Sequence, residues 1–120
     1  MLIHLLKSKI HRACITGGNV NYEGSLTISE DLMERAGLLD NERILCSNLA
    51  GGQRFETYVI PGPRGDGVIV LNGAAAHCGK TGDRLTIMSF AAVDAHEAVN
   101  WKPKVIVLGE DNKIVDERGI

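Results

Sequence analysis

The sequence of 120 residues predicts a small, mainly β fold with short helices, and a barrel is the arrangement we expect. Short runs of Ile, Val and Leu recur along the chain between Gly, Pro or Asn-Gly signals, which is the pattern of strands joined by turns. Aromatic residues make up only 4%, so the core must consist of aliphatic side chains. This length supports one core and no linker divides it, so we expect residues 1–120 to form a single domain.

The first strand is predicted over residues 9–16. Polar and apolar side chains alternate there, and a Gly-Gly-Asn triplet ends the run, which is typical of a strand that leads into a loop. Alternate side chains of a regular strand point to the same face. We therefore expect Lys9, His11 and Ala13 to share one face.

A short helix is predicted between Ser29 and Gly37. Ser29 is a favourable N-cap residue, and two acidic residues follow it in the first turn. The apolar stripe of this helix consists of Leu32, Met33 and Ala36. Gly37 is a typical C-terminal stop.

Five further strands are predicted, over residues 43–46, 55–60, 67–71, 84–90 and 104–108. Residues 62–67 are short, rich in Gly and Pro and flanked by strands, so they are expected to form a surface turn. The tail, residues 110–120, is polar enough that we expect it to fray.

Composition excludes several classes of function. The formal net charge is -2 and the pI is near 6.1, so the chain lacks the basic excess that binds nucleic acid. No segment reaches transmembrane length, and His4 and Lys7 interrupt the apolar start of the chain before it could form a secretory signal. We therefore expect neither a nucleic-acid partner nor a membrane.

The three cysteines, Cys14, Cys46 and Cys78, are dispersed and form no CxxC pair. This spacing argues against a disulfide framework and against a structural zinc site, and a reducing cytoplasm is the simplest location. His77 and Cys78 are the only adjacent pair of possible metal ligands, and such a pair is far more often ordinary packing. We expect no metal.

Common catalytic motifs are absent. The sequence has no H-E-x-x-H, G-x-S-x-G, GxGxxG or P-loop pattern, so the usual protease, hydrolase and nucleotide-binding interpretations lack their residues. Motifs alone leave the function open.

Four segments nevertheless occur in the order and spacing found in aspartate 1-decarboxylases, which the chain resembles from about residue 1 to residue 103. They are Lys9-Ile10-His11-Arg12, Tyr22-Glu23-Gly24-Ser25, Arg54-Phe55-Glu56-Thr57-Tyr58 and Asn72-Gly73-Ala74-Ala75-Ala76. Departures from the family pattern at Gly18-Asn19 and Gly51-Gly52 lie in expected loops. The resemblance implies a double-psi β-barrel, a homotetramer with active sites between subunits, and production of β-alanine from L-aspartate for pantothenate synthesis.

The resemblance further implies that the chain cuts itself between Gly24 and Ser25 into residues 1–24 and 25–120. By itself a Gly-Ser pair before a strand is nearly always a turn. Gly24 leaves its carbonyl unshielded and can adopt a strained backbone, so the Ser25 hydroxyl could attack that carbonyl. An acyl shift, β-elimination and hydrolysis would turn Ser25 into a covalent pyruvoyl cofactor. Whether a maturation partner is needed stays open.

Thr57 and Tyr58 receive different roles from the resemblance. Thr57 would bond the Gly24 carbonyl oxygen as it becomes tetrahedral, although a β-branched strand residue is its ordinary interpretation. Tyr58 would protonate the carbon that lost CO2. Neighbours on a regular strand point to opposite faces, so both can serve one site only if the strand ends, bulges or lies between subunits.

Substrate binding would use the cations. The pyruvoyl carbonyl would form an imine with the substrate amine, and aspartate brings two carboxylates. Arg54 offers a planar fork, Lys9 a point charge, and His11 a weaker contribution. A solvated cationic face is the ordinary alternative for these residues.

The remaining candidates lie near the cleavage loop. Tyr22 could support binding or belong to the core. Asn72 and Gly73 would ordinarily form a tight turn with the alanines opening a short helix. In this family the Asn72 amide and the backbone N–H groups of Gly73, Ala74 and Ala75 could bond substrate or the pyruvoyl oxygen.

Two competing functions stay open at this point. A non-catalytic barrel used as a binding module would remain uncleaved. A pyruvoyl enzyme for another amino acid, such as glutamate, would be cleaved but would prefer a longer side chain.

Overall fold

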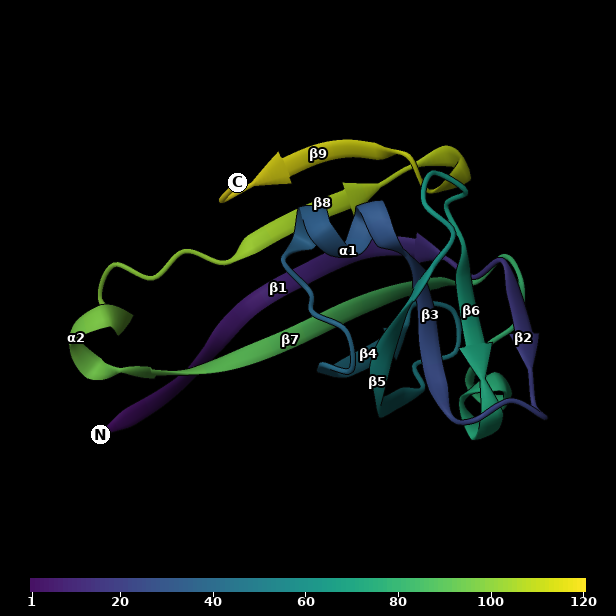
Figure 1. Ribbon diagram of the computed structural model, residues 1–120, viewed down its shortest axis with the longest axis horizontal. Helices are drawn as coiled ribbons and strands as arrows, with labels where there is room; N and C mark the ends of the chain where they lie inside the picture. The colour runs from purple at the N-terminus through teal and green to yellow at the C-terminus, as the bar shows by residue number, and fades with distance from the viewer.

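The computed structural model describes all residues, 1–120, and shows nine strands in one curved sheet (Figure 1). The strands are β1 (Leu2–Cys14), β2 (Gly17–Asn19), β3 (Ser25–Ser29), β4 (Arg43–Asn48), β5 (Arg54–Gly62), β6 (Ile69–Asn72), β7 (Arg84–Asp94), β8 (Lys104–Leu108) and β9 (Ile114–Arg118). The helices are α1 (Glu30–Ala36), η1 (Gly73–Cys78), α2 (Ala95–Ala98) and η2 (Glu110–Asn112). The fold is mainly β with short helices, as predicted; the double-psi arrangement stays a prediction.

The sheet mixes parallel and antiparallel pairs in the order β2-β6-β3-β5-β4-β7-β1-β8-β9. Three pairs are parallel: β1 with β8, β2 with β6, and β3 with β5. The longest pair, β1 with β7, extends to one end of the molecule, where α2 lies (Figure 1). Strand β5 lies between β3, which pairs with one of its edges, and β4, which pairs with the other.

The core is aliphatic, as the composition predicted. Eighteen buried side chains form one cluster, and its largest fully buried members include Ile10, Leu26, Ile87 and Ile106. Burial of a side chain of this size stabilises the fold by about 1.5–3 kcal/mol.

Helix α1 confirms the prediction for its stripe and its end. Leu32, Met33 and Ala36 are buried, and Gly37 ends the helix with a φ of 76°. Ser29 is the N-cap residue, as predicted, but its side chain makes no capping bond. Its hydroxyl instead donates to the carbonyl of Pro63 at 3.0 Å and accepts from the N–H of Val68 at 2.8 Å, which fastens the exposed turn between β5 and β6.

Strand β1 contains a bulge that corrects the predicted face. Ile10 pairs with Ile87 and Ala13 with Leu85, so two residues of β1 oppose one of β7. Arg12, one of the two, has a φ of 65°. Ala13 is fully buried and therefore does not share the face of Lys9 and His11.

The tail prediction was also wrong. Strand β9 pairs antiparallel with β8, and Ile114 packs against the core (Figure 1). The side chain of Asn112 is buried, accepts from the N–H of Cys14 at 2.7 Å, and donates to the carbonyls of Cys14 and Gly67, each at 2.8 Å. These three hydrogen bonds to the backbone hold the tail in place, although its polar sequence had suggested that it would fray.

Candidate active site

Ser25 is the first residue of β3 and is fully buried. Its hydroxyl donates to the carbonyl of Glu23 at 3.1 Å and accepts from Nδ2 of Asn72 at 3.0 Å. Ser25 and Asn72 are register partners across the antiparallel pair of β3 and β6. The structure therefore brings two predicted site residues into direct contact.

Asn72 is itself buried, at 4% exposure, and makes a second bond that the sequence analysis did not anticipate. Its Nδ2 also donates to Oγ1 of Thr27 at 2.9 Å. Thr27 lies two residues after Ser25 on a strand, so its side chain points to the same face. This spacing was visible in the sequence and could have identified Thr27.

A cavity of about 250 Å³ lies against the loop that ends at Gly24. It is lined by Gly24, Phe55, Glu56, Thr57, Ala74, Ala75 and Cys78. This one cavity is thus lined by four of the predicted site residues, Gly24, Thr57, Ala74 and Ala75. The side chain of Thr57 makes no hydrogen bond within the chain, so its hydroxyl is free to bond a new partner.

The backbone argument made for Gly24 is wrong for this conformation. Gly24 does not lie in the left-handed region, and a β-carbon at this position would meet nothing within 4 Å. Gly73 is the constrained glycine, with a φ of 66°, and it opens the short helix η1 as the Asn-Gly turn predicted.

Thr57 and Tyr58 lie on opposite faces of β5. Thr57 pairs with the buried Ile44 and Tyr58 with the exposed Arg43, and the pairing of β5 with β4 has no irregularity there. The strand neither ends nor bulges between these residues, so within one chain they cannot serve the same site.

We call the side of β5, β4, β7 and β1 that carries Arg54 and Tyr58 the outer face. Ser47 on β4 is the register partner of both Arg54 and Thr86. Oγ1 of Thr86 lies 3.5 Å from Nδ1 of His11, and the Ser47 hydroxyl is buried without a hydrogen-bond partner. Arg54 and His11 therefore occupy the two ends of one row of polar side chains.

Lys9 lies on the outer face in the neighbouring row. It pairs with Met88, which pairs with Leu45, which in turn pairs with Glu56. Neither Lys9 nor Arg54 forms an ion pair within the chain. Two uncompensated cations on one face are available to bind carboxylates.

The charge on His11 is suppressed by its surroundings. Burial lowers the pKa of its imidazole below 6.5, and the nearby charges of Lys9, Arg12 and Arg118 lower it further. The lowered pKa favours the neutral form of His11, which can act on this face as a hydrogen-bonding group rather than as a third cation.

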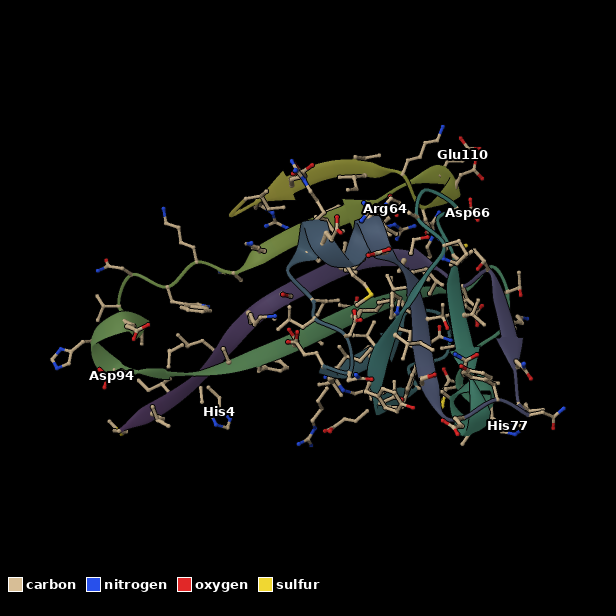
Figure 2. The ribbon with its side chains drawn as sticks, viewed as in Figure 1. His4, Arg64, Asp66, His77, Asp94 and Glu110 are labelled. Carbon is tan, nitrogen blue, oxygen red and sulfur yellow. The ribbon has the colours of Figure 1, made fainter.

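A second cavity of about 400 Å³ opens on the outer face. Its lining is His4, Arg43, Ile44, Leu45, Glu56 and Phe90. Arg43 and Glu56 form an ion pair here, and Phe90 is half exposed. Figure 2 places His4 beside the projecting part of β1 and β7, far from His77 at η1.

Tyr22 lies in the loop that precedes Gly24 and is 52% exposed, so the alternative that it belongs to the core is wrong. All three cysteines are free, and burial, together with the nearby Cys78, raises the pKa of Cys46 to about 12. No group of three or more His, Cys, Asp or Glu side chains could hold a metal ion. None of the helices combines the length and apolar character needed to cross a membrane.

Comparison with known proteins shows the family. The family model described as "Aspartate decarboxylase" matches residues 1–115. The chain is 53% identical to the aspartate 1-decarboxylase of Pelotomaculum thermopropionicum over 118 residues, which cover 98% of this chain and 89% of the relative. It is 51% identical to the aspartate 1-decarboxylase of Thermoanaerobacter pseudethanolicus over 112 residues, which cover 93% of this chain and 96% of the relative. The chain therefore belongs to the aspartate decarboxylase family and is an enzyme of the carboxy-lyase class.

Proposed function

We propose that this chain is a precursor that cuts itself between Gly24 and Ser25 and then converts L-aspartate to β-alanine and CO2 with a pyruvoyl group made from Ser25. The observation that carries the proposal is the placement of Ser25. Its buried hydroxyl is held by Asn72 and by the carbonyl of Glu23, directly after the exposed Gly24. Family membership supplies the reaction class.

The cleavage uses atoms of this chain and one water. Oγ of Ser25 attacks the carbonyl carbon of Gly24, the C–N bond breaks, and the hydroxyl proton moves to the released amine. Loss of the Ser25 Cα proton then expels the Gly24 carboxylate from Cβ and leaves dehydroalanine at residue 25. Water replaces the nitrogen of this residue, and ammonia leaves.

Thr57 supports the first step by its position. Its unpaired hydroxyl borders the same cavity as Gly24, so it can donate to the carbonyl oxygen of Gly24 as negative charge develops there. A donor of this kind contributes about 10²- to 10³-fold in rate. We assign Thr57 this oxyanion role.

The surroundings of Ser25 fit a pyruvoyl group. Asn72 directs an amide donor at this position from a buried site, and the backbone of Gly73, Ala74 and Ala75 follows directly, so donors for the oxygens of the group are present. When formed, the group supplies a carbonyl that accepts the substrate amine and an adjacent amide that takes up the electrons released with CO2.

Substrate recognition is assigned to the outer face. Arg54 and Lys9 would hold the two carboxylates of aspartate, with neutral His11 as a hydrogen-bonding neighbour. Tyr58 would deliver the proton to the carbon that lost CO2. Tyr22, exposed beside the cleavage loop, is assigned to the rim of the site.

Lys9, Arg54 and Tyr58 lie on the outer face and point away from Thr57, so we propose that the site is completed between copies of the chain. The outer face of one copy would cover the Gly24 cavity of another. Large apolar side chains are exposed on β1, on β7 and next to α2, among them Leu2 (66%), Phe90 (50%) and Val99 (82%), and such exposure favours contact between copies. The homotetramer expected from the resemblance, and a cytoplasmic role in pantothenate synthesis, belong to this proposal.

The test is an intact mass spectrum of purified wild-type protein and of Ser25→Ala. Wild type should give a chain of residues 1–24 and a chain of residues 25–120 that is one ammonia lighter than simple hydrolysis predicts. Ser25→Ala should stay whole and inactive. An uncut, inactive wild-type chain, after incubation with and without cell extract to supply any maturation partner, would refute the proposal.

Turnover of aspartate and glutamate by the cleaved protein fixes the substrate. We expect aspartate to be strongly preferred, since the chain belongs to the aspartate decarboxylase family. Sedimentation of the same sample reports the oligomer, and a cleaved, active monomer would refute the shared site.

A further inference from the structure

Gly73 lies against the cleavage loop, and the contact leaves no room for a side chain. A β-carbon at Gly73 would lie 2.7 Å from Cα of Gly24, 2.8 Å from its backbone nitrogen and 3.0 Å from the carbonyl oxygen of Tyr22. All three neighbours are backbone atoms, so no side-chain rotation relieves the overlap. Ordinary carbon contacts are 3.5–4.0 Å, so the loop would have to move by about 1 Å.

The two residues that flank the scissile bond are thus held by two consecutive residues of another segment. Asn72 donates to the Ser25 hydroxyl at 3.0 Å, and Gly73 packs on the backbone of Gly24. Figure 1 shows the loop between β2 and β3 running beside η1, whose first residue is Gly73.

We infer that Gly73 is a positioning residue for the self-cleavage, an inference that rests on the function proposed above. Its missing side chain sets where the Gly24 carbonyl carbon sits relative to the Ser25 hydroxyl, which Asn72 fixes independently. In the cleavage step Gly73 acts through the loop, against whose backbone it packs at Gly24 and Tyr22. The glycine on which cleavage geometry depends is therefore residue 73, because a β-carbon at Gly24 itself would meet nothing within 4 Å.

The step that this placement controls is the attack of Ser25 Oγ on the Gly24 carbonyl carbon. The Oγ–C bond forms, the C–N bond breaks and the hydroxyl proton passes to the amine, with no other reactant. A misplacement of 1 Å between reacting groups costs about 100-fold in rate.

Two substitutions separate contact from backbone strain. Gly73→Ala adds a β-carbon and also strains a backbone whose φ is 66°. Gly73→Asn adds the same β-carbon, but Asn tolerates the left-handed conformation better than other side chains. Gly52 is the matched control, since its φ is 79° and a β-carbon there would meet nothing within 4 Å.

The experiment follows cleavage of wild type, Gly73→Ala, Gly73→Asn, Gly52→Ala and Gly52→Asn by intact mass at a temperature where circular dichroism shows each to be folded. Hydroxylamine, which cuts esters, traps the product of the acyl shift. Both Gly73 variants should cleave about 100-fold more slowly than wild type, and their hydroxylamine product should form more slowly by the same factor, because the acyl shift itself is slowed. Both Gly52 variants should cleave within about threefold of wild type, since only the backbone strain is shared.

Each outcome is decisive. A folded Gly73→Asn chain that cleaves at the wild-type rate would overturn the inference and leave the proposed function intact. Failure of wild type to cleave would refute the proposed function itself. If both Gly73 variants fail to fold where the Gly52 variants fold, Gly73 serves folding, and the assignment to cleavage is overturned.

Discussion

Thr57→Val removes one hydroxyl at nearly constant volume, and its effect can be worked out from the structure. The Thr57 hydroxyl has no hydrogen-bond partner within the chain and borders the cavity beside Gly24. No intramolecular bond is lost in the folded precursor, so the free energy of unfolding should change by less than about 0.5 kcal/mol. Cleavage should slow by about 10²- to 10³-fold, which corresponds to about 2.7–4 kcal/mol in the barrier.

Thr27→Val is the matched control on the neighbouring strand. The Thr27 hydroxyl accepts from Asn72 at 2.9 Å, so its loss should lower the free energy of unfolding by about 1 kcal/mol. Asn72 keeps its bond to Ser25, so cleavage should remain within about tenfold of wild type. Thr57→Val should therefore slow cleavage and leave the free energy of unfolding nearly unchanged. Thr27→Val should lower the free energy of unfolding and leave the cleavage rate nearly unchanged.

Both quantities are measurable on the same samples. Urea unfolding of each variant in a Ser25→Ala background reports stability without cleavage, and intact mass against time reports cleavage in the native background. A Thr57→Val chain that cleaves as fast as wild type would refute the oxyanion role. A Thr57→Val chain that loses as much stability as Thr27→Val would show that its hydroxyl has a structural partner instead.

Tyr58→Phe should cleave normally, yet β-alanine production should fall by roughly 10²- to 10⁴-fold; near-normal production would assign the proton to another donor. Arg54→Lys should raise KM for aspartate roughly tenfold without altering cleavage, because a bidentate fork becomes a point donor, and unchanged kinetics would remove Arg54 from the site. The pKa of His11 is lowered from 6.5 in the folded state, so the unfolded chain binds more protons and the free energy of unfolding falls as pH drops below 6.5. His11→Gln should lose less stability over this pH range. Urea unfolding that shows the same pH dependence for wild type and His11→Gln would contradict this prediction. After cleavage, residues 1–24 should stay bound in native mass spectra, and a free small chain under native conditions would count against the fold as described.

The sequence predicted helix α1 and strands that overlap β1 and β4 to β8, because those elements rest on local patterns. It did not predict β9, nor β2, which occupies the Gly-Gly-Asn triplet that was expected to be a loop. Turn residues and aliphatic runs located the strands, and Gly37 located the helix end. The bulge in β1 gave no such signal, because Arg12 adopts a φ of 65° without being Gly or Asn. Ala13 was therefore assigned to the wrong face. The prediction for the tail, residues 110–120, was wrong for a related reason. The order of the tail depends on hydrogen bonds of Asn112 to residues far away in the chain.

The candidate site shows the same division. Four motifs located Ser25, Thr57 and Asn72, and the structure places Ser25 against Asn72 and lines one cavity with Gly24 and Thr57. Alternation on β5 was enough to predict that Thr57 and Tyr58 diverge. Local patterns could not predict the polar side chains near Arg54. The row through Ser47 and Thr86 depends on the register of three strands, β5, β4 and β7.

The proposed cleavage breaks the chain at a point where covalent continuity matters little for the fold. Residues before the cut are held by β1, which pairs with β7 and β8, and by β2, which pairs with β6. Ile10 and Ile15 are buried in the core, and two such side chains stabilise the association by about 3–6 kcal/mol. Gly24, by contrast, is exposed, and a β-carbon there would touch nothing. The scissile bond therefore lies between a firmly held strand pair and a firmly held serine, so that bond can break without releasing either side.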